Sequence, residues 1–213
     1  MKKRVVCFGD SNTWGYKATN KERFEDDERW TGLMQEELGD KYTVIEEGLN
    51  GRTTVWDDPI EVDKNGYKHL FTVLKSHKPF DLIIIMLGTN DLKSRFSVTA
   101  YDIARSAALL ASEAMSCDCG RSGNPPKVLL AAPIPLGRDI MESQFSGMFQ
   151  PDCFERSLEF DRRFSDFANE IGCFYINAGD YAAPDPLDCI HLTSDGHKAL
   201  ASAMTQKVKS IIG

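Results

Sequence analysis

Three side chains from two distant segments could together perform acyl transfer. Ser11 lies near the N-terminus, within Gly9-Asp10-Ser11-Asn12-Thr13, and Asp188 and His191 lie three residues apart near the C-terminus. A serine hydroxyl becomes a nucleophile when a histidine accepts its proton, and a carboxylate on the far ring nitrogen fixes the tautomer that this requires. Ser11 taken alone is better explained as a helix cap. The presence of a base and its partner favours the catalytic interpretation.

The same chemistry needs hydrogen-bond donors where the ester carbonyl oxygen becomes negative. The candidates are the backbone N–H groups of Ser11 and Gly51 and the side-chain amide of Asn90, since each follows a predicted strand. Losing one such donor typically lowers the rate by about 10²–10³. Gly51 alone is better explained as a turn glycine, and Asn90 alone as a loop cap. Combined with Ser11 and His191, they favour an acyl-transfer site.

Five short apolar segments must position these residues. They occupy residues 4–9, 42–47, 81–87, 127–132 and 173–177 and are rich in β-branched side chains. Runs such as Leu82-Ile83-Ile84-Ile85 do not alternate apolar with polar residues, which is typical of strands covered on both faces. Most of them start roughly 40 residues apart, as when a helix follows each strand. The sequence therefore predicts an α/β fold of three layers, whose parallel sheet binds ligands at its carboxyl edge.

The segments between these strands show helical periodicity. Apolar side chains recur at helical spacing over residues 160–171 and 200–211. Thr99 and Asp102 resemble a capping box that opens a helix ending near residue 115. A further helix is predicted over residues 28–38 and ended by a glycine.

One domain is predicted over residues 1–213, because neither a linker nor an internal repeat interrupts the pattern. The main irregularity is an apolar insertion after the fourth strand, residues 133–152. An apolar loop of this kind forms a lid, a pocket wall or a subunit contact.

Composition excludes several classes of partner. The 213 residues are 42% hydrophobic and 27% charged, as in an ordinary globular protein. The net charge of −7 and the lack of a basic tract argue against nucleic acid. The longest apolar run, residues 82–87, is far shorter than the roughly 20 residues of a membrane span. The apolar run after Lys2-Lys3-Arg4 is too short for an export signal, so we expect a cytoplasmic protein with no membrane partner.

Cysteine spacing gives no reason to expect a metal. Six cysteines in a chain without an export signal are expected to be free thiols. Cys117 and Cys119 are separated by one residue rather than by the two of a zinc knuckle, and no second pair accompanies them. The sequence therefore predicts neither a metal nor a cofactor.

Four blocks of the sequence resemble those of the SGNH, or GDSL, hydrolases. They are Gly9-Asp10-Ser11, a glycine after the second predicted strand, Gly88-Thr89-Asn90-Asp91 and Asp188-x-x-His191, in the family's order. The resemblance implies a flavodoxin-like sheet of order 2-1-3-4-5 and a Ser-His-Asp esterase without metal. It assigns Ser11 as nucleophile and oxyanion donor, Gly51 and Asn90 as the other donors, His191 as base and Asp188 as its partner.

A narrower resemblance is to the bacterial arylesterase and acyltransferase branch of that family. It rests on Cys7-Phe8-Gly9-Asp10-Ser11-x-Thr13-Trp14-Gly15, Arg29-Trp30-Thr31-Gly32 and Ile85-Met86-Leu87-Gly88-Thr89-Asn90-Asp91. It implies a homo-oligomer with a narrowed entrance, short acyl groups and acyl transfer to alcohols. One departure is that Asn12 stands where that branch usually has leucine.

The substrate pocket is expected to be lined by Asn12, Trp14, Tyr16 and Trp56. Core packing is an equal alternative for each of the three aromatic residues.

These observations predict a serine esterase that hydrolyses short-chain carboxylic esters, such as aryl, alkyl or sugar acetates, through an acyl-serine intermediate. A metal-dependent phosphoesterase is one alternative, but no Asp-x-His pair occurs in the chain. An α/β-hydrolase is disfavoured because the Gly-x-Ser-x-Gly elbow is absent. A non-enzymatic flavodoxin-like binding module is the other alternative, but it leaves Asp188 and His191 unexplained.

Overall fold

Five parallel strands form the centre of the molecule. The structure, a computed structural model, describes residues 1–213. The strands lie in the order β2-β1-β3-β4-β5, and every neighbouring pair is parallel. Their bounds are β1 Lys3–Gly9, β2 Tyr42–Gly48, β3 Leu82–Met86, β4 Lys127–Ala132 and β5 Phe174–Asn177. The predicted strands and their predicted order are confirmed.

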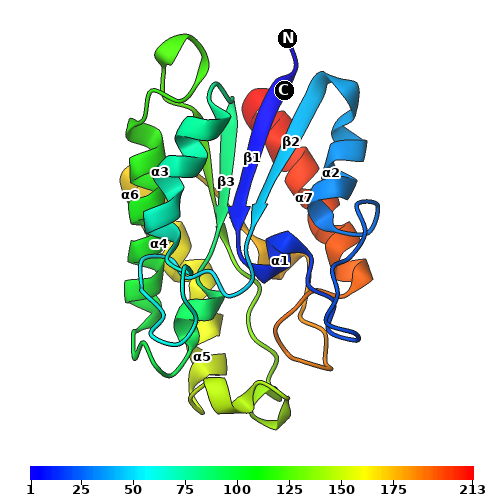
Figure 1. The fold of residues 1–213 in the computed structure, drawn as a ribbon, viewed down its shortest axis with the longest axis vertical. Helices are drawn as coiled ribbons and strands as arrows, with labels where there is room; N and C mark the ends of the chain where they lie inside the picture. The colour runs from blue at the N-terminus through cyan, green and yellow to red at the C-terminus, as the bar shows by residue number, and fades with distance from the viewer.

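Helices cover both faces of the sheet, which gives the three predicted layers (Figure 1). One face packs against α3 (Gly66–His77), α4 (Ala100–Ser116) and α6 (Phe160–Ile171), and the other against α2 (Trp30–Leu38) and α7 (Ser194–Ile212). Successive residues of β1 serve both cores, since Val6 and Phe8 face the first set of helices and Val5 and Cys7 face the second. This two-sided burial explains why the strands lack polar alternation.

Local signals in the sequence mark the start of α4 at its capping box and the end of α2 before Gly39, as predicted. The Thr99 hydroxyl accepts from the Asp102 N–H, and the Asp102 carboxylate accepts from the Thr99 N–H, so the capping box that opens α4 is present. Helix α2 begins at Trp30, two residues later than predicted, because Arg29 has extended backbone and its side chain binds Glu46.

Several short elements complete the connections. Two are α-helices, α1 (Ser11–Trp14) and α5 (Cys153–Leu158). Six are 3₁₀ turns: η1 Gly39–Lys41, η2 Thr89–Leu92, η3 Arg121–Gly123, η4 Ile140–Glu142, η5 Ser146–Met148 and η6 Ala178–Asp180. Residues 133–152 are irregular apart from η4 and η5, as the sequence predicts.

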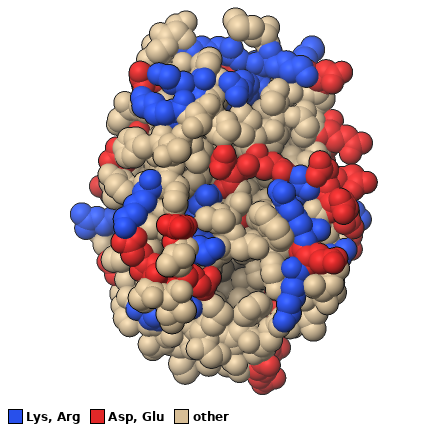
Figure 2. Space-filling model, in the orientation of Figure 1, with Lys and Arg blue, Asp and Glu red and all other residues tan.

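The strands point their carboxyl ends away from the two chain termini (Figure 1). Beyond those ends lie α1 and the long loops, and the surface there is hollowed, with acidic and basic side chains around the opening (Figure 2). None of the helices is both long and apolar enough to cross a membrane.

Candidate active site

Ser11, His191 and Asp188 form a connected hydrogen-bonded row at the carboxyl edge of the sheet. The His191 Nε2 lies 2.9 Å from the Ser11 Oγ, and the His191 Nδ1 lies 2.6 Å from the Asp188 Oδ2. All three residues are buried. This is the order of contacts in which a carboxylate orients a histidine and the histidine receives the serine proton.

The loop that carries the histidine is shaped by Asp188 itself. Its Oδ1 accepts from the backbone N–H groups of Ile190 and His191, each at 2.9 Å, while its Oδ2 faces the imidazole. Burial alone would raise the pKa of Asp188, but the hydrogen bonds and charge of His191 and the two backbone donors hold it below its ordinary value. Asp188 is therefore an anion well suited to stabilise an imidazolium.

Two glycines allow the serine to sit close to the strand ends. A Cβ on Gly48 would lie 2.2 Å from the Trp14 backbone nitrogen, and a Cβ on Gly9 would lie 2.0 Å from the Thr13 Oγ1. Helix α1 can therefore pack directly against β1 and β2 only because both positions lack a side chain. Ser11, as the first residue of that helix, is held at the sheet edge.

Backbone and side-chain donors face the same hollow as Ser11. The N–H groups of Ser11 and Gly51 donate to no acceptor in the protein. Gly51 has a φ of +81°, a conformation that favours glycine. The Asn90 Nδ2 donates to the Arg52 carbonyl at 3.1 Å, which fixes the amide while leaving its second hydrogen available. Such donors can stabilise a developing oxyanion.

Buried polar residues support this edge from behind. The Arg52 guanidinium donates to the Gly9 carbonyl at 2.8 Å, and both carboxylate oxygens of Asp91 accept from the Thr54 N–H at 3.1 Å. Burial raises the pKa of Asp10 to about 6 and that of Asp91 to about 7. Neither carboxylate hydrogen-bonds to Ser11 Oγ or to the His191 ring, so both belong to the framework of the site.

The hollow in front of Ser11 has a volume of about 210 Å³ and is lined by both apolar and polar side chains. The apolar ones are Tyr16, Phe145, Met148, Phe149 and Ile190. The polar ones include Asn50, Glu61, Thr89 and Lys93. The Lys93 ammonium is buried and binds Glu61 at 2.8 Å, so these two charges neutralise each other.

Of the four predicted pocket residues, one lines the hollow. Tyr16 lines the hollow, and its ring centre lies 4.2 Å from that of His191. Asn12, Trp14 and Trp56 are not among the residues that line it.

Each of the three is held elsewhere by its own contacts. The Asn12 side chain is buried and hydrogen-bonds to the backbone of Ile190 and Leu192. The Trp14 ring lies under the Arg23 guanidinium at 5.4 Å. Trp56 is half-buried in the loop before α3, where its carbonyl accepts from the Thr53 hydroxyl at 2.6 Å.

Sequence reasoning missed most of the pocket wall. The three apolar residues Phe145, Met148 and Phe149 come from the insertion at 133–152, which had been expected as a lid, a wall or a subunit contact. The signal in the sequence that could have identified them is the clustering of large apolar residues in one loop. Glu61 and Lys93 gave no signal, because charged residues in loops are ordinarily solvated.

Metal-binding side chains do not gather anywhere in the chain. No group of three or more histidine, cysteine, aspartate or glutamate residues is arranged to hold a metal ion. The six cysteines are free thiols.

Comparison with known proteins gives a consistent result. A model of the GDSL-like lipase/acylhydrolase family matches residues 7–199. A carbohydrate acetylesterase from Sinorhizobium meliloti is 40% identical over 99% of this chain and 100% of that chain, with a TM-score of 0.93. An aryl esterase from M. smegmatis is 37% identical over 99% and 100%, with a TM-score of 0.92. A search of curated proteins found no match.

Proposed function

The chain belongs to the GDSL-like lipase/acylhydrolase family and is a carboxylic ester hydrolase, and from this premise we propose that Ser11, His191 and Asp188 are its catalytic residues. The observation that carries the proposal is the continuous contact from Ser11 Oγ to His191 Nε2 and from His191 Nδ1 to Asp188 Oδ2. No other serine hydroxyl of the chain hydrogen-bonds to a histidine ring.

The reaction proceeds through an acyl-serine intermediate. His191 takes the proton of the Ser11 hydroxyl as the oxygen attacks the ester carbonyl, and then gives that proton to the departing alcohol. Water enters next, loses a proton to the same histidine and releases the acid. Asp188 stabilises the imidazolium in both halves of the reaction, which its depressed pKa favours.

The oxyanion is held by the backbone N–H groups of Ser11 and Gly51 and by the Asn90 amide. Support comes from the two unpaired backbone donors and from the anchoring of Asn90 by the Arg52 carbonyl. All three residues line the hollow in front of the nucleophile. Donors that are fixed before the reaction need no reorganisation when charge develops.

Short acyl groups fit this hollow best. Its volume of about 210 Å³ is below the roughly 300–1,000 Å³ of a typical drug-sized pocket, and Phe145 and Phe149 narrow it. The relatives are named as a carbohydrate acetylesterase and an aryl esterase. We therefore propose that the substrates are small-molecule acetates or similarly short esters of aryl, alkyl or sugar alcohols.

Hydrolysis of para-nitrophenyl esters with two, four and eight acyl carbons tests this proposal. We expect the two-carbon ester to be hydrolysed fastest by the wild type, and the Ser11→Ala variant to be inactive on all three. Ser157→Ala, which alters a buried serine away from the row, serves as the matched control. Activity that survives in Ser11→Ala would overturn the catalytic assignment, and fastest hydrolysis of the eight-carbon ester would overturn the assignment of short acyl groups.

A homo-oligomer is a further proposal about this protein. Most apolar side chains of residues 133–152 are buried within the chain, among them Ile134, Leu136 and Ile140, so they do not support it. Better support comes from Ile60 and Val62, which are 74% and 78% exposed on either side of the pocket residue Glu61. Light scattering at micromolar concentration tests the assembly, and a monomeric mass would refute it.

A cytoplasmic location is also proposed, because six free thiols suit a reducing compartment. Fractionation of cells that produce the tagged chain tests this location, and recovery outside the cytoplasm would refute it.

A further inference from the structure

Asn12 connects the segment of the nucleophile to the segment of the base. Its Nδ2 donates to the Ile190 carbonyl at 3.2 Å, and its Oδ1 accepts from the Leu192 N–H at 2.9 Å. These two backbone groups immediately precede and follow His191 in the chain. Asn12 is only 3% exposed and lies outside the substrate pocket, so it cannot touch an ester bound there.

We propose that Asn12 is a positioning residue, whose side-chain amide fixes the backbone on both sides of His191 and so sets the distance from the imidazole to Ser11. The inference rests on the proposed function, because it takes His191 as the base. Asn12 follows Ser11 directly in the chain, and its two hydrogen-bond partners, the Ile190 carbonyl and the Leu192 N–H, belong to the residues on either side of His191. The side-chain amide of Asn12 therefore links the nucleophile segment to the base segment and fixes the distance between them.

The Asn12 main chain is itself held on both sides, which makes this amide a firm anchor. Its N–H donates to the Asp10 carboxylate at 3.0 Å, and its carbonyl accepts from the Trp30 indole N–H at 3.0 Å. Trp30 is completely buried in the core formed by α2 and α7. The amide thus ties the His191 loop to the interior of the protein rather than to another loop.

Other contacts on His191 do not duplicate this restraint. Asp188 holds the Nδ1 atom and the N–H groups of Ile190 and His191, and the Asp185 N–H donates to the His191 carbonyl at 2.6 Å. The Ile190 carbonyl and the Leu192 N–H have only Asn12 as a partner.

Only an asparagine supplies both bonds at this reach. Its amide offers one acceptor and one donor on a short side chain, as a neighbouring strand would. Leucine offers neither, and aspartate keeps the acceptor but places an oxygen against the Ile190 carbonyl. The two substitutions therefore remove the restraint to different degrees.

Steady-state kinetics of Asn12→Leu and Asn12→Asp test the inference. We expect kcat on para-nitrophenyl acetate to fall about 10- to 100-fold in Asn12→Leu, as for a small misplacement of reacting groups, and by less in Asn12→Asp. KM should stay within about threefold in both, because Asn12 does not line the pocket. The low-field proton resonance of the His191 Nδ1–H should shift or broaden in Asn12→Leu, which a purely structural role would not cause in a folded variant.

Asn65→Leu is the matched control. Asn65 is similarly buried and also bonds two backbone groups, with its Nδ2 on the Val55 carbonyl and its Oδ1 on the Lys68 N–H. We expect it to lower thermal stability while leaving kcat and the low-field resonance unchanged.

The outcomes separate this inference from the proposed function. Wild-type kcat with an unchanged resonance in either Asn12 variant would overturn the inference, and Asn12→Asp gives this test even if Asn12→Leu does not fold. An equal fall of kcat in Asn65→Leu would also overturn it, since general destabilisation would then explain the loss. Activity remaining in Ser11→Ala would instead remove the proposed function.

Discussion

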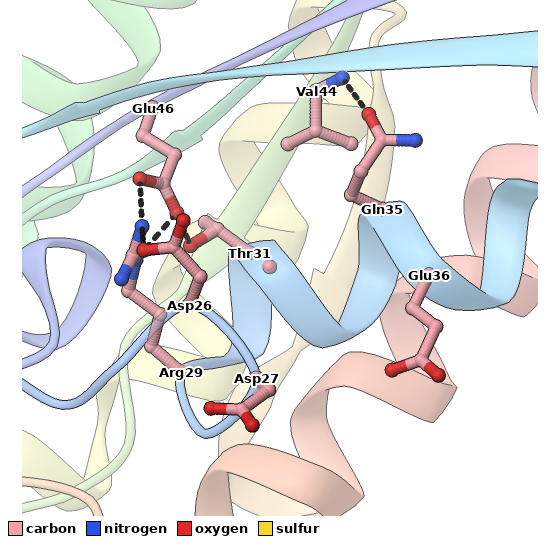
Figure 3. Close-up of a pocket in the computed structure, with 9 residues that line it drawn as sticks. Asp26, Asp27, Arg29, Thr31, Gln35, Glu36, Val44 and Glu46 are labelled. Atoms are coloured by element: carbon pink, nitrogen blue, oxygen red, sulfur yellow. Dashed lines mark hydrogen bonds and ion pairs between the residues drawn. The ribbon is translucent and has the colours of Figure 1, made fainter. Parts of the chain in front are cut away.

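Two hollows of this molecule differ in size and in the state of their polar groups. The larger one, about 550 Å³, lies between α2 and β2, and the smaller one, about 210 Å³, lies in front of Ser11. In the larger hollow, Arg29 and Glu46 point toward each other and are bonded, while Asp27 and Glu36 point away (Figure 3). In the smaller hollow, the Asn50 Oδ1 and the Thr89 Oγ1 are buried without any partner.

The difference shows that volume alone does not mark a site. The polar groups of the larger hollow satisfy one another, because Glu46 accepts from both Arg29 and Thr31, and Arg29 also pairs with Asp26. Unpaired buried polar groups, as in the smaller hollow, cost folding free energy unless water or a ligand completes their hydrogen bonds.

Carboxylates of the two regions also differ in the direction of their pKa shifts. Burial alone would raise the pKa of Glu46, but its bonds to Arg29 and Thr31 lower it below the ordinary value. Burial raises the pKa of Asp10 to about 6 and that of Asp91 to about 7 behind the smaller hollow. Burial thus outweighs hydrogen bonding at Asp10 and Asp91, whereas hydrogen bonding outweighs burial at Glu46.

The strongest test of this contrast compares the carboxylate that binds His191 behind the smaller hollow with a carboxylate that lines the larger hollow. We expect Asp188→Asn to lower kcat by about 10⁴, because the amide stabilises the wrong histidine tautomer. Asp26→Asn removes an ion pair with Arg29 in the larger hollow and should leave kcat unchanged. Hydrolysis of para-nitrophenyl acetate measures both, and a similar loss in the two variants would contradict the distinction.

A smaller loss is expected at the proposed oxyanion donors. Asn90→Ala removes the side-chain amide that faces Ser11 and should lower kcat by about 10²–10³ with little change in KM. Gln35→Ala removes an amide of the larger hollow, whose Oε1 accepts from the Val44 N–H at 2.7 Å, and should leave kcat unchanged. If Asn90→Ala raised only KM, the amide would bind substrate rather than the oxyanion.

Substitution in the larger hollow should lower stability and leave catalysis unchanged. Glu46→Gln breaks charged hydrogen bonds to a nearly buried arginine, so we expect the free energy of unfolding to fall by about 1.5–3 kcal/mol. The kcat should stay at the wild-type value, because Glu46 is remote from the Ser11 row. Urea unfolding at pH 7 measures the first quantity, and a large loss of kcat in the folded variant would argue against two independent regions.

The sequence predicted the framework of the smaller hollow well because strand signals are local. The unalternated runs gave the strands, and the carboxyl-edge rule brought Ser11, Asn90 and His191 to one side of the sheet. The spacing of Asp188 and His191 likewise predicted a contact that lies within three residues of chain.

The pocket wall could not be predicted in the same way, because it depends on how loops pack against the sheet edge rather than on a local repeat. Asn12 and Tyr16 lie only four residues apart, yet one turns to the backbone beside His191 and the other to its ring. The Lys93–Glu61 pair joins loops 32 residues apart and has no periodic pattern. Tertiary contacts alone decide these positions.

The pH dependence of stability gives the smallest and most specific test of the two-hollow contrast. Asp91 ionises near its ordinary pKa in the unfolded chain but only near pH 7 in the folded protein. Between about pH 4 and 7 the folded state holds the extra proton, so this residue makes stability fall as pH rises. Asp91→Asn should therefore gain stability relative to the wild type over that range, apart from a constant offset.

Glu46 has the opposite sign. Its lowered pKa contributes stability that is present above its unfolded pKa and is lost as pH falls through the folded value. Glu46→Gln should thus be least stable relative to the wild type at pH 7 and approach it in acid. Urea unfolding measures the Asp91→Asn trend between about pH 4 and 7.5 and the Glu46→Gln trend below about pH 5, down through the lowered pKa of Glu46. Parallel curves would mean that the carboxylates behind Ser11 are as well compensated as the ion pair in the larger hollow, and the physical contrast between the regions would fail.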